Sequence, residues 1–159
     1  MKLLALERAQ MFTPRDAAVA LVAVACTCGG FAIAFQSPVL GSTAFDKSAI
    51  AAKPTEAGSV RSFFMARTAT VERLEVHETT LNPGRSPHPP HRHPNEEMIL
   101  METGTVEALV NGEWKRVGPG SVVFFASNQL HGLRNAGSEP AVYHVVNWKT
   151  SETPAGSAK

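Results

Sequence analysis

The sequence predicts an all-β fold, in which a single antiparallel β-barrel of the jelly-roll type follows an N-terminal signal or anchor segment. From Ser59 onward, short apolar or alternating runs recur between Gly, Pro and Asn residues, and helical periodicity is hard to find. About eight short runs of this kind, with no helix between them, are typical of a barrel or jelly roll.

The predicted strands follow one another at short intervals. They are Val60–Ala66, Val71–Thr80, Met98–Met101, Thr105–Val110, Trp114–Val117, Ser121–Ala126, His131–Asn135 and Val142–Trp148. Asn111-Gly112 lies between two of them and predicts a tight hairpin, because both turn residues must accept positive φ. Gly118-Pro119-Gly120 marks another turn.

Residues 1–35 are expected to be a signal peptide or a membrane anchor. No charged residue occurs from Ala17 to Phe35, basic residues precede this run, and Ala32-Ile33-Ala34 resembles a small-x-small cleavage site. The run is just long enough to span a bilayer, but its many alanines and its glycines favour cleavage over anchoring. We therefore expect a periplasmic or secreted protein, with a membrane-anchored protein as the alternative. Translation could begin at Met1 or at Met11.

The rest of the chain divides by composition. Residues 36–58 contain proline and glycine among small and polar residues, and they predict an extended arm without much structure of its own. Residues 59–150 form the expected barrel, and residues 151–159 a flexible tail. The sequence leaves open whether the arm packs on its own barrel or on a neighbouring subunit.

Charge and cysteine content exclude several classes of function. Fifteen basic and fourteen acidic residues give a net charge of +1, and no basic run suggests nucleic acid as a partner. The two cysteines, Cys26 and Cys28, both lie in the N-terminal apolar run. The expected barrel therefore has no thiol, which argues against a disulfide framework and against a cysteine nucleophile.

A cluster of histidines carries the predicted chemistry. His91 and His93 are two residues apart, so on an extended strand both imidazoles point to the same face. Pro94-Asn95 breaks that strand, and Glu97 can return from the far side of the turn. Two imidazoles and a carboxylate suit a divalent first-row metal, and a fourth ligand must come from elsewhere in the chain.

This arrangement resembles the first motif of the cupin superfamily. That motif is a glycine, His-x-His, three or four residues, Glu, six residues and a second glycine. The corresponding residues here are Gly84, His91, His93, Glu97 and Gly104, and six residues rather than five precede His91.

The second cupin motif is matched less closely. Gly120 is followed by Ala126 where the motif has proline, by Asn128 where it has glycine, and then by His131 and Asn135. Asparagine tolerates the left-handed backbone that glycine would supply, so the turn is expected to survive. The resemblance covers about residues 82–136.

The resemblance implies a metal site of three histidines and one glutamate, namely His91, His93, Glu97 and His131, inside a conical barrel. In octahedral geometry these ligands would leave two adjacent positions open, which suits Fe, Mn, Ni or Cu. Zn in tetrahedral geometry would be saturated by the same four groups. The ligands alone do not name the metal.

The remaining polar residues are assigned by their neighbours in the sequence. Glu97 and His88 are the candidates for acid–base catalysis, with His88 expected at the barrel mouth. His144 is expected to be structural and His77 to lie on a solvated face. Three further polar residues are expected to point outward or to be structural: Glu96, Arg92 and Asn135.

Five large apolar residues are expected mostly in the barrel core: Met98, Met101, Phe124, Phe125 and Trp148.

The resulting hypothesis is an exported metal-dependent enzyme, dioxygenase-like, that acts on a small oxygenated organic substrate. One alternative is an isomerase or lyase working through an enolate. Another is a non-catalytic cupin that binds a sugar or a small acid. The resemblance also allows a homodimer. No nucleic acid is expected as partner, and a membrane only if the N-terminal segment is not cleaved.

Overall fold

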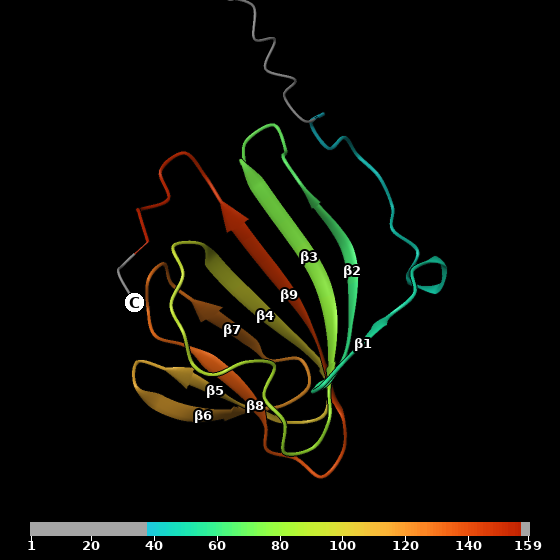
Figure 1. Ribbon diagram of the computed structural model, residues 1–159, viewed down its shortest axis with the longest axis vertical. Helices are drawn as coiled ribbons and strands as arrows, with labels where there is room; N and C mark the ends of the chain where they lie inside the picture. Colours follow the sequence, from blue (N-terminus) through green and yellow to red (C-terminus); the bar gives the residue numbers. More distant parts are fainter. Residues whose placement is uncertain (1–37, 157–159) are drawn as a thin grey trace, which may run out of the picture. The chain divides into compact units, whose positions relative to one another are not determined.

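The computed structural model describes residues 38–156, which are built almost entirely of antiparallel strands (Figure 1). The segment expected to be a signal peptide or anchor lies outside these residues. Within them, no helix is long and apolar enough to cross a membrane. One 3-10 turn, η1 (Lys47–Ala49), precedes nine strands: β1 (Lys53–Thr55), β2 (Gly58–Ala66), β3 (Arg73–Leu81), β4 (Glu96–Thr103), β5 (Val106–Val110), β6 (Glu113–Val117), β7 (Val122–Phe125), β8 (Gly132–Asn135) and β9 (Ala141–Lys149).

The strands form two sheets. The larger has the order β1-β2-β3-β9-β4-β7 and the smaller the order β6-β5-β8, with every neighbouring pair antiparallel. One hydrophobic core joins them: Ile99, Phe125 and Tyr143 of the larger sheet pack in the same cluster as Val106 and Leu133 of the smaller. The predicted all-β antiparallel fold is therefore confirmed.

Alternation along β9 shows why these residues form a half-buried strand. Ala141, Tyr143, Val145 and Asn147 are buried, and the residues between them are only partly covered. Successive side chains of a strand point to opposite faces, so the buried set lines the inside of the barrel. This inner face positions the candidate site.

Turn chemistry agrees with the sequence. Asn111 and Gly112 have φ of 54° and 82°, and they join β5 to β6 as a two-residue hairpin. Asn128 has φ of 59°, so it supplies the left-handed backbone expected of it in place of glycine. Each of the eight predicted runs corresponds to one of the strands β2 to β9.

The segment before the barrel is more structured than its composition suggests. It contains η1 and β1, and β1 pairs with β2 at the edge of the larger sheet. Lys47 of η1 forms an ion pair with Glu78 of β3, and Arg61 of β2 donates to the carbonyl of Lys47 at 3.0 Å. The described part of the predicted arm therefore packs on its own barrel.

The expected core is wrong in part. Met101 and Phe125 are buried, but Phe124 is 50% exposed, and Met98 and Trp148 are only half-buried. Phe124 pairs with Met98, and Phe125 pairs with the inward residue Glu97. The register therefore places Phe124 on the outer face of the sheet.

We expect Gly104→Ala to destabilise the fold more than Gly112→Ala. Both glycines have positive φ, which costs an alanine roughly 1–2 kcal/mol. A Cβ on Gly104 would also lie 2.6 Å from the Cα of Ala141, whereas a Cβ on Gly112 meets nothing within 4 Å. Urea unfolding of the two variants measures the difference. Equal losses of stability would contradict the packing argument.

Candidate metal centre

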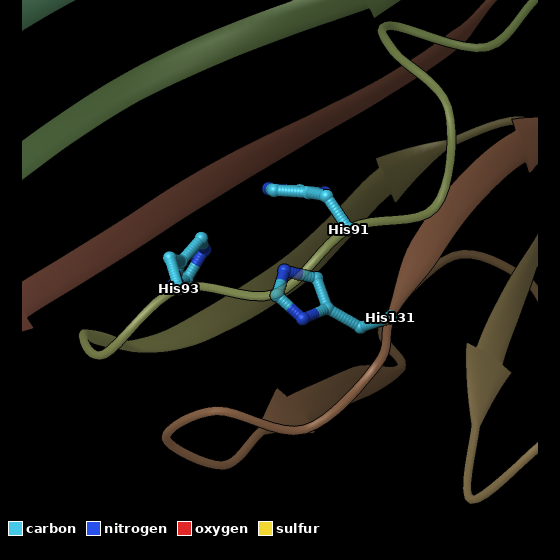
Figure 2. A group of neighbouring side chains, drawn as sticks. All are labelled: His91, His93 and His131. Atoms are coloured by element: carbon cyan, nitrogen blue, oxygen red, sulfur yellow. The ribbon is translucent and has the colours of Figure 1, made fainter. Parts of the chain in front are cut away.

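Two short backbone segments bring the three central histidines together. His91 and His93 lie on the segment that leads into β4, and His131 directly precedes β8. The N–H of His91 donates to the carbonyl of His131 at 2.9 Å, and the N–H of His131 donates back at 3.0 Å. This isolated bridge fixes residues forty positions apart in the chain side by side (Figure 2).

The three imidazoles converge, as Figure 2 shows. One ring nitrogen from each lies within 4.8 Å of the others. Ring centroids are 4.6 Å apart between His91 and His131 and also between His93 and His131. The ring of Phe125 stacks on His131 at 4.6 Å and covers it from the core side.

Hydrogen bonds select which nitrogens face the centre. Nδ1 of His93 lies 2.9 Å from the carbonyl of Asn95, and Nδ1 of His131 lies 2.8 Å from the carbonyl of Gln129. A carbonyl only accepts, so both Nδ1 atoms carry the proton and both Nε2 atoms keep a free lone pair. This is the arrangement found around metal-binding histidines.

Two buried nitrogens of these three histidines have no hydrogen-bond partner within the described residues. They are Nε2 of His131 and Nδ1 of His91. An unpaired buried polar atom is costly, and a divalent cation would satisfy both at once. The three histidines therefore fit a metal ion on the chemistry of their donor atoms.

Glu97 reaches this group from the side of His93. Its carboxylate lies 3.6 Å from Nε2 of His93 and accepts a hydrogen bond of 3.2 Å from Asn147. Asn147 in turn accepts from Asn95 at 2.8 Å. The compact group within 4.8 Å contains the three histidines but not Glu97, so the fourth predicted ligand is adjacent to the centre rather than inside it.

The electrostatic environment favours neutral imidazoles at two of the three positions. Burial, together with the neighbouring histidines, lowers the pKa of His91 to about 4. Burial also lowers the pKa of His131. Contact with Glu97 raises the pKa of His93. Burial alone would raise the pKa of Glu97, but His93 and Asn147 stabilise its charged form and the net shift is downward.

A cavity of about 560 Å³ opens beside the histidines. Glu97, His131 and His88 line it, together with an apolar wall that includes Ile99, Leu133 and Val145. A cavity of this size accommodates a small organic molecule.

Some of the other predicted residues line the cavity and some lie away from it. His88 is exposed at the cavity and its ring lies 4.2 Å from that of His91, which agrees with the expected place at the mouth. His77 was expected on a solvated face, and this expectation is wrong: His77 lines the cavity.

Two of the predicted residues lie away from the cavity. Glu96 accepts a hydrogen bond from the indole of Trp148 at 3.0 Å. Arg92 is exposed and donates to the carbonyl of Asn128 at 2.8 Å.

His144 belongs to a second group of charged residues, with Glu78 and Glu102, on the outer side of the larger sheet. Lys47 forms ion pairs with both glutamates of this group. The group therefore anchors η1 to the sheet, and His144 is structural as expected.

Asn135 is also structural as expected. Its amide donates to the carbonyls of Leu81 at 2.7 Å and Glu139 at 2.9 Å, and its oxygen accepts from Gly137.

Sequence reasoning missed Asn147 and Asn95. Asn147 is buried and occupies an inward position of β9, in a row that is otherwise apolar. A polar residue at an inward position of an alternating strand is the signal that could have found it.

We expect the metal-free protein to lose stability as the pH falls from about 6.5 towards 4. In that range the unfolded chain accepts protons that native His91 and His131 resist, so the unfolded state binds more protons. The raised pKa of His93 acts in the opposite direction and reduces the slope. His91→Asn should therefore lose less stability between pH 7 and pH 5 than the wild type, measured by urea unfolding with a chelator present. An equal loss of stability between pH 7 and pH 5 in His91→Asn and in the wild type would contradict the lowered pKa of His91.

Comparisons with known proteins agree with the geometry. Residues 77–147 match the family model described as "Cupin domain". No curated protein matches the sequence.

Many solved structures are similar to the chain, and three of them illustrate the likeness. The polyketide cyclase RemF from Streptomyces resistomycificus has 18% identity and a TM-score of 0.57, over 75% of this chain and 88% of that one. KdgF from Halomonas sp. has 16% identity and a TM-score of 0.55, over 72% and 100%. A predicted oxalate decarboxylase from Thermotoga maritima has 20% identity and a TM-score of 0.52, over 67% and 99%. At these identities the likeness shows the fold alone. Together, the match of residues 77–147 to the cupin-domain model and these similar structures show that the described residues have the cupin fold.

Proposed function

We propose that this cupin is a metal-dependent enzyme that acts on a small oxygenated organic molecule, with dioxygenase-like oxidation as the reaction class. One observation carries the proposal. Three histidines converge within 4.8 Å beside a cavity of about 560 Å³, and two of their buried nitrogens have no protein partner among the described residues.

His91, His93 and His131 would hold the metal, and Glu97 would complete the set after a small movement towards them. A bound Fe, Mn, Ni or Cu ion supplies Lewis acidity and, for the redox-active members, electron transfer. Zn remains an alternative. The neutral state of His91 and His131 favours binding, since a protonated imidazole cannot be a ligand.

The chain's own residues select the substrate. The apolar side chains of Val60, Ile99 and Leu133 line the cavity and exclude water from the reacting groups. Arg85 and His88 are exposed residues that also line it. Such a cavity suits a small molecule with an apolar body and an acidic or oxygenated end, which the guanidinium of Arg85 would attract.

An isomerase or lyase is the second candidate. His88 favours it, because an exposed imidazole 4.2 Å from the ring of His91 could move protons on a substrate in the cavity. The neighbours include a polyketide cyclase and a predicted oxalate decarboxylase, which are named for reactions on small molecules. Non-catalytic binding of a sugar or small acid is the outcome if no turnover is found.

Oxygen dependence separates the candidates. The full-length protein, loaded in turn with each metal, is incubated with a panel of small hydroxy, oxo and dicarboxylic acids under air and under nitrogen. We expect turnover with oxygen uptake under air only, and its loss in His93→Ala. Equal turnover under nitrogen would establish the isomerase or lyase, whereas binding without turnover would establish the binding protein.

Export of the protein is part of the proposal and rests on the composition of residues 1–35. Fractionation of the native cells and N-terminal sequencing of the mature chain test it. Recovery of the chain in the cytoplasm, starting at Met1 or Met11, would contradict export.

We expect Asn147→Ala to weaken metal binding by about 10- to 100-fold, because Asn147 holds the carboxylate of Glu97 and is itself held by Asn95. Isothermal titration with Zn²⁺ or Mn²⁺ measures the affinity. Asn135→Ala is the matched control, since Asn135 is buried and hydrogen-bonded but does not contact the centre. The control should lower stability and leave the affinity of the folded protein unchanged. Equal affinities in both variants would contradict the role of Asn147.

A further inference from the structure

A second histidine site lies on the cavity wall, across β9 from the metal centre. Strand register defines its place: Glu75 of β3 pairs with Asn147 of β9, and Asn147 pairs with Glu97 of β4. These three residues therefore share one row on the inner face. Neighbouring strands are about 4.8 Å apart, so Glu75 lies roughly 10 Å from Glu97 along this row.

His77 follows on the same face of β3, two residues after Glu75. It lines the same cavity as Glu97 and His131, and its side chain is 20% exposed. A substrate that reached the histidine centre from this cavity would also contact His77. The cavity thus has an imidazole on each of two facing walls.

The carboxylate of Glu75 lies beside this imidazole. Nδ1 of His77 lies 3.2 Å from Oε1 of Glu75, and Oε2 of Glu75 accepts from Arg73 at 2.9 Å. Nδ1 is buried and has no aligned hydrogen-bond partner, so the exposed part of the ring includes its Nε2 edge. Nε2 is therefore the nitrogen of His77 that a substrate in the cavity can reach, while Nδ1 lies on the side of Glu75.

We propose that His77 is a general base of this enzyme, oriented by Glu75, which is itself held by Arg73. The inference deepens the proposed function and rests on it, because the substrate must occupy the cavity between His77 and the three central histidines. The substrate class is a carbonyl compound with a hydrogen on the carbon next to the carbonyl, such as a small 2-oxo acid.

The proton-transfer step balances within these groups. The C–H bond next to the carbonyl breaks, and its electron pair forms the double bond of an enolate. The proton forms an N–H bond at Nε2 of His77, and the resulting imidazolium is paired with Glu75. Returning the proton to the substrate restores the neutral imidazole. An enolate is the starting point for isomerisation, for lyase chemistry and for oxidation by dioxygen.

Strand register identifies the side chains that lie next to His77. On its own strand it faces Glu75, with Arg73 beyond. From the two neighbouring strands, its register partners are Ser62 of β2 and Val145 of β9, and neither titrates. Glu97 lies across β9, two residue pairs further along the register. Glu75 is the charged group beside the His77 ring, at 3.2 Å, and Glu56, Arg85 and His88 line the same cavity.

The first test is independent of metal and of substrate. Nitrogen-15 NMR of the metal-free full-length chain reports the tautomer of each histidine. We expect neutral His77 to carry its proton on Nδ1, towards Glu75, and this preference to weaken in Glu75→Gln. A proton on Nε2, or no change in Glu75→Gln, would overturn the proposal.

The second test uses 2-oxobutanoate as a probe. The Mn²⁺-loaded protein is incubated with it in D₂O under nitrogen, and mass spectrometry measures deuterium uptake at carbon 3. We expect His77→Asn to lower the exchange rate by about 100-fold or more while Mn²⁺ affinity stays unchanged. The wild-type pH profile should have the same midpoint as the His77 NMR titration. His144→Asn, a change on the outer face of β9, is the control and should exchange at the wild-type rate.

The outcomes separate this proposal from the proposed function. Exchange that is lost in His91→Ala together with Mn²⁺ binding, but is retained in His77→Asn, would overturn the role of His77 and leave the enzyme in place. Absence of exchange in the wild-type protein would overturn the role of His77 as a base, whereas the oxygen-uptake experiment decides the proposed function separately. Loss of deuterium exchange in His77→Asn, with Mn²⁺ binding unchanged, supports both the role of His77 and the proposed enzyme.

Discussion

The pair of backbone hydrogen bonds between His91 and His131 is the constraint on which the site depends. Its two bonds, of 2.9 and 3.0 Å, join the segment before β4 of the larger sheet to the segment before β8 of the smaller. Neither residue lies within a strand, so no longer ladder holds them in register. The same contact between the two segments therefore brings two imidazoles together, with their ring centroids 4.6 Å apart. One backbone contact therefore both joins the two segments and defines the spacing of His91 and His131.

Burial then determines the chemical state of the assembled groups. His91 and His131 remain neutral because the cost of desolvating an imidazolium exceeds what the protein returns. His93 keeps a carboxylate beside it and holds a proton more readily. A metal ion that binds at this centre therefore competes with protons mainly at His93, and much less at His91 and His131. The arrangement prepares the centre for a cation at neutral pH.

Much of the fold could be predicted from the sequence because its turns and its alternation are local properties. Asn111-Gly112 defines its hairpin by backbone preference alone, and β9 shows its inner face by alternation. β1 was missed because Lys53-Pro54-Thr55 is a fully exposed edge strand without an apolar pattern. Its existence depends on pairing with β2, which the local sequence does not reveal.

The site was also predictable where it depends on local patterns in the sequence, and not where it depends on pairing between distant strands. The spacing of His91 and His93 is local, whereas His131 needed the longer cupin motif. His77 was misplaced because its face of β3 is polar and resembles a solvated surface. Pairing with Val145 turns that face inward, and pairing is a long-range property. Phe124 shows the converse: all four residues of β7 are apolar, so only its register identifies the outward ones.

The edge strand β1 has a consequence for access to the cavity. Thr55, Glu56 and Ala57, at and just after its end, form part of the cavity wall, and Ala57 is held there by a 2.8 Å hydrogen bond from Asn82. The residues before them are fastened across the outside of the sheet through Lys47 and Arg61. A protease that trimmed the chain only as far as residue 45 would leave this wall complete. Trimming that removed the edge strand and its turn would widen the entrance and expose the interior to larger molecules. The residues at the end of β1 and in the turn after it therefore help to set the size of the entrance to the cavity.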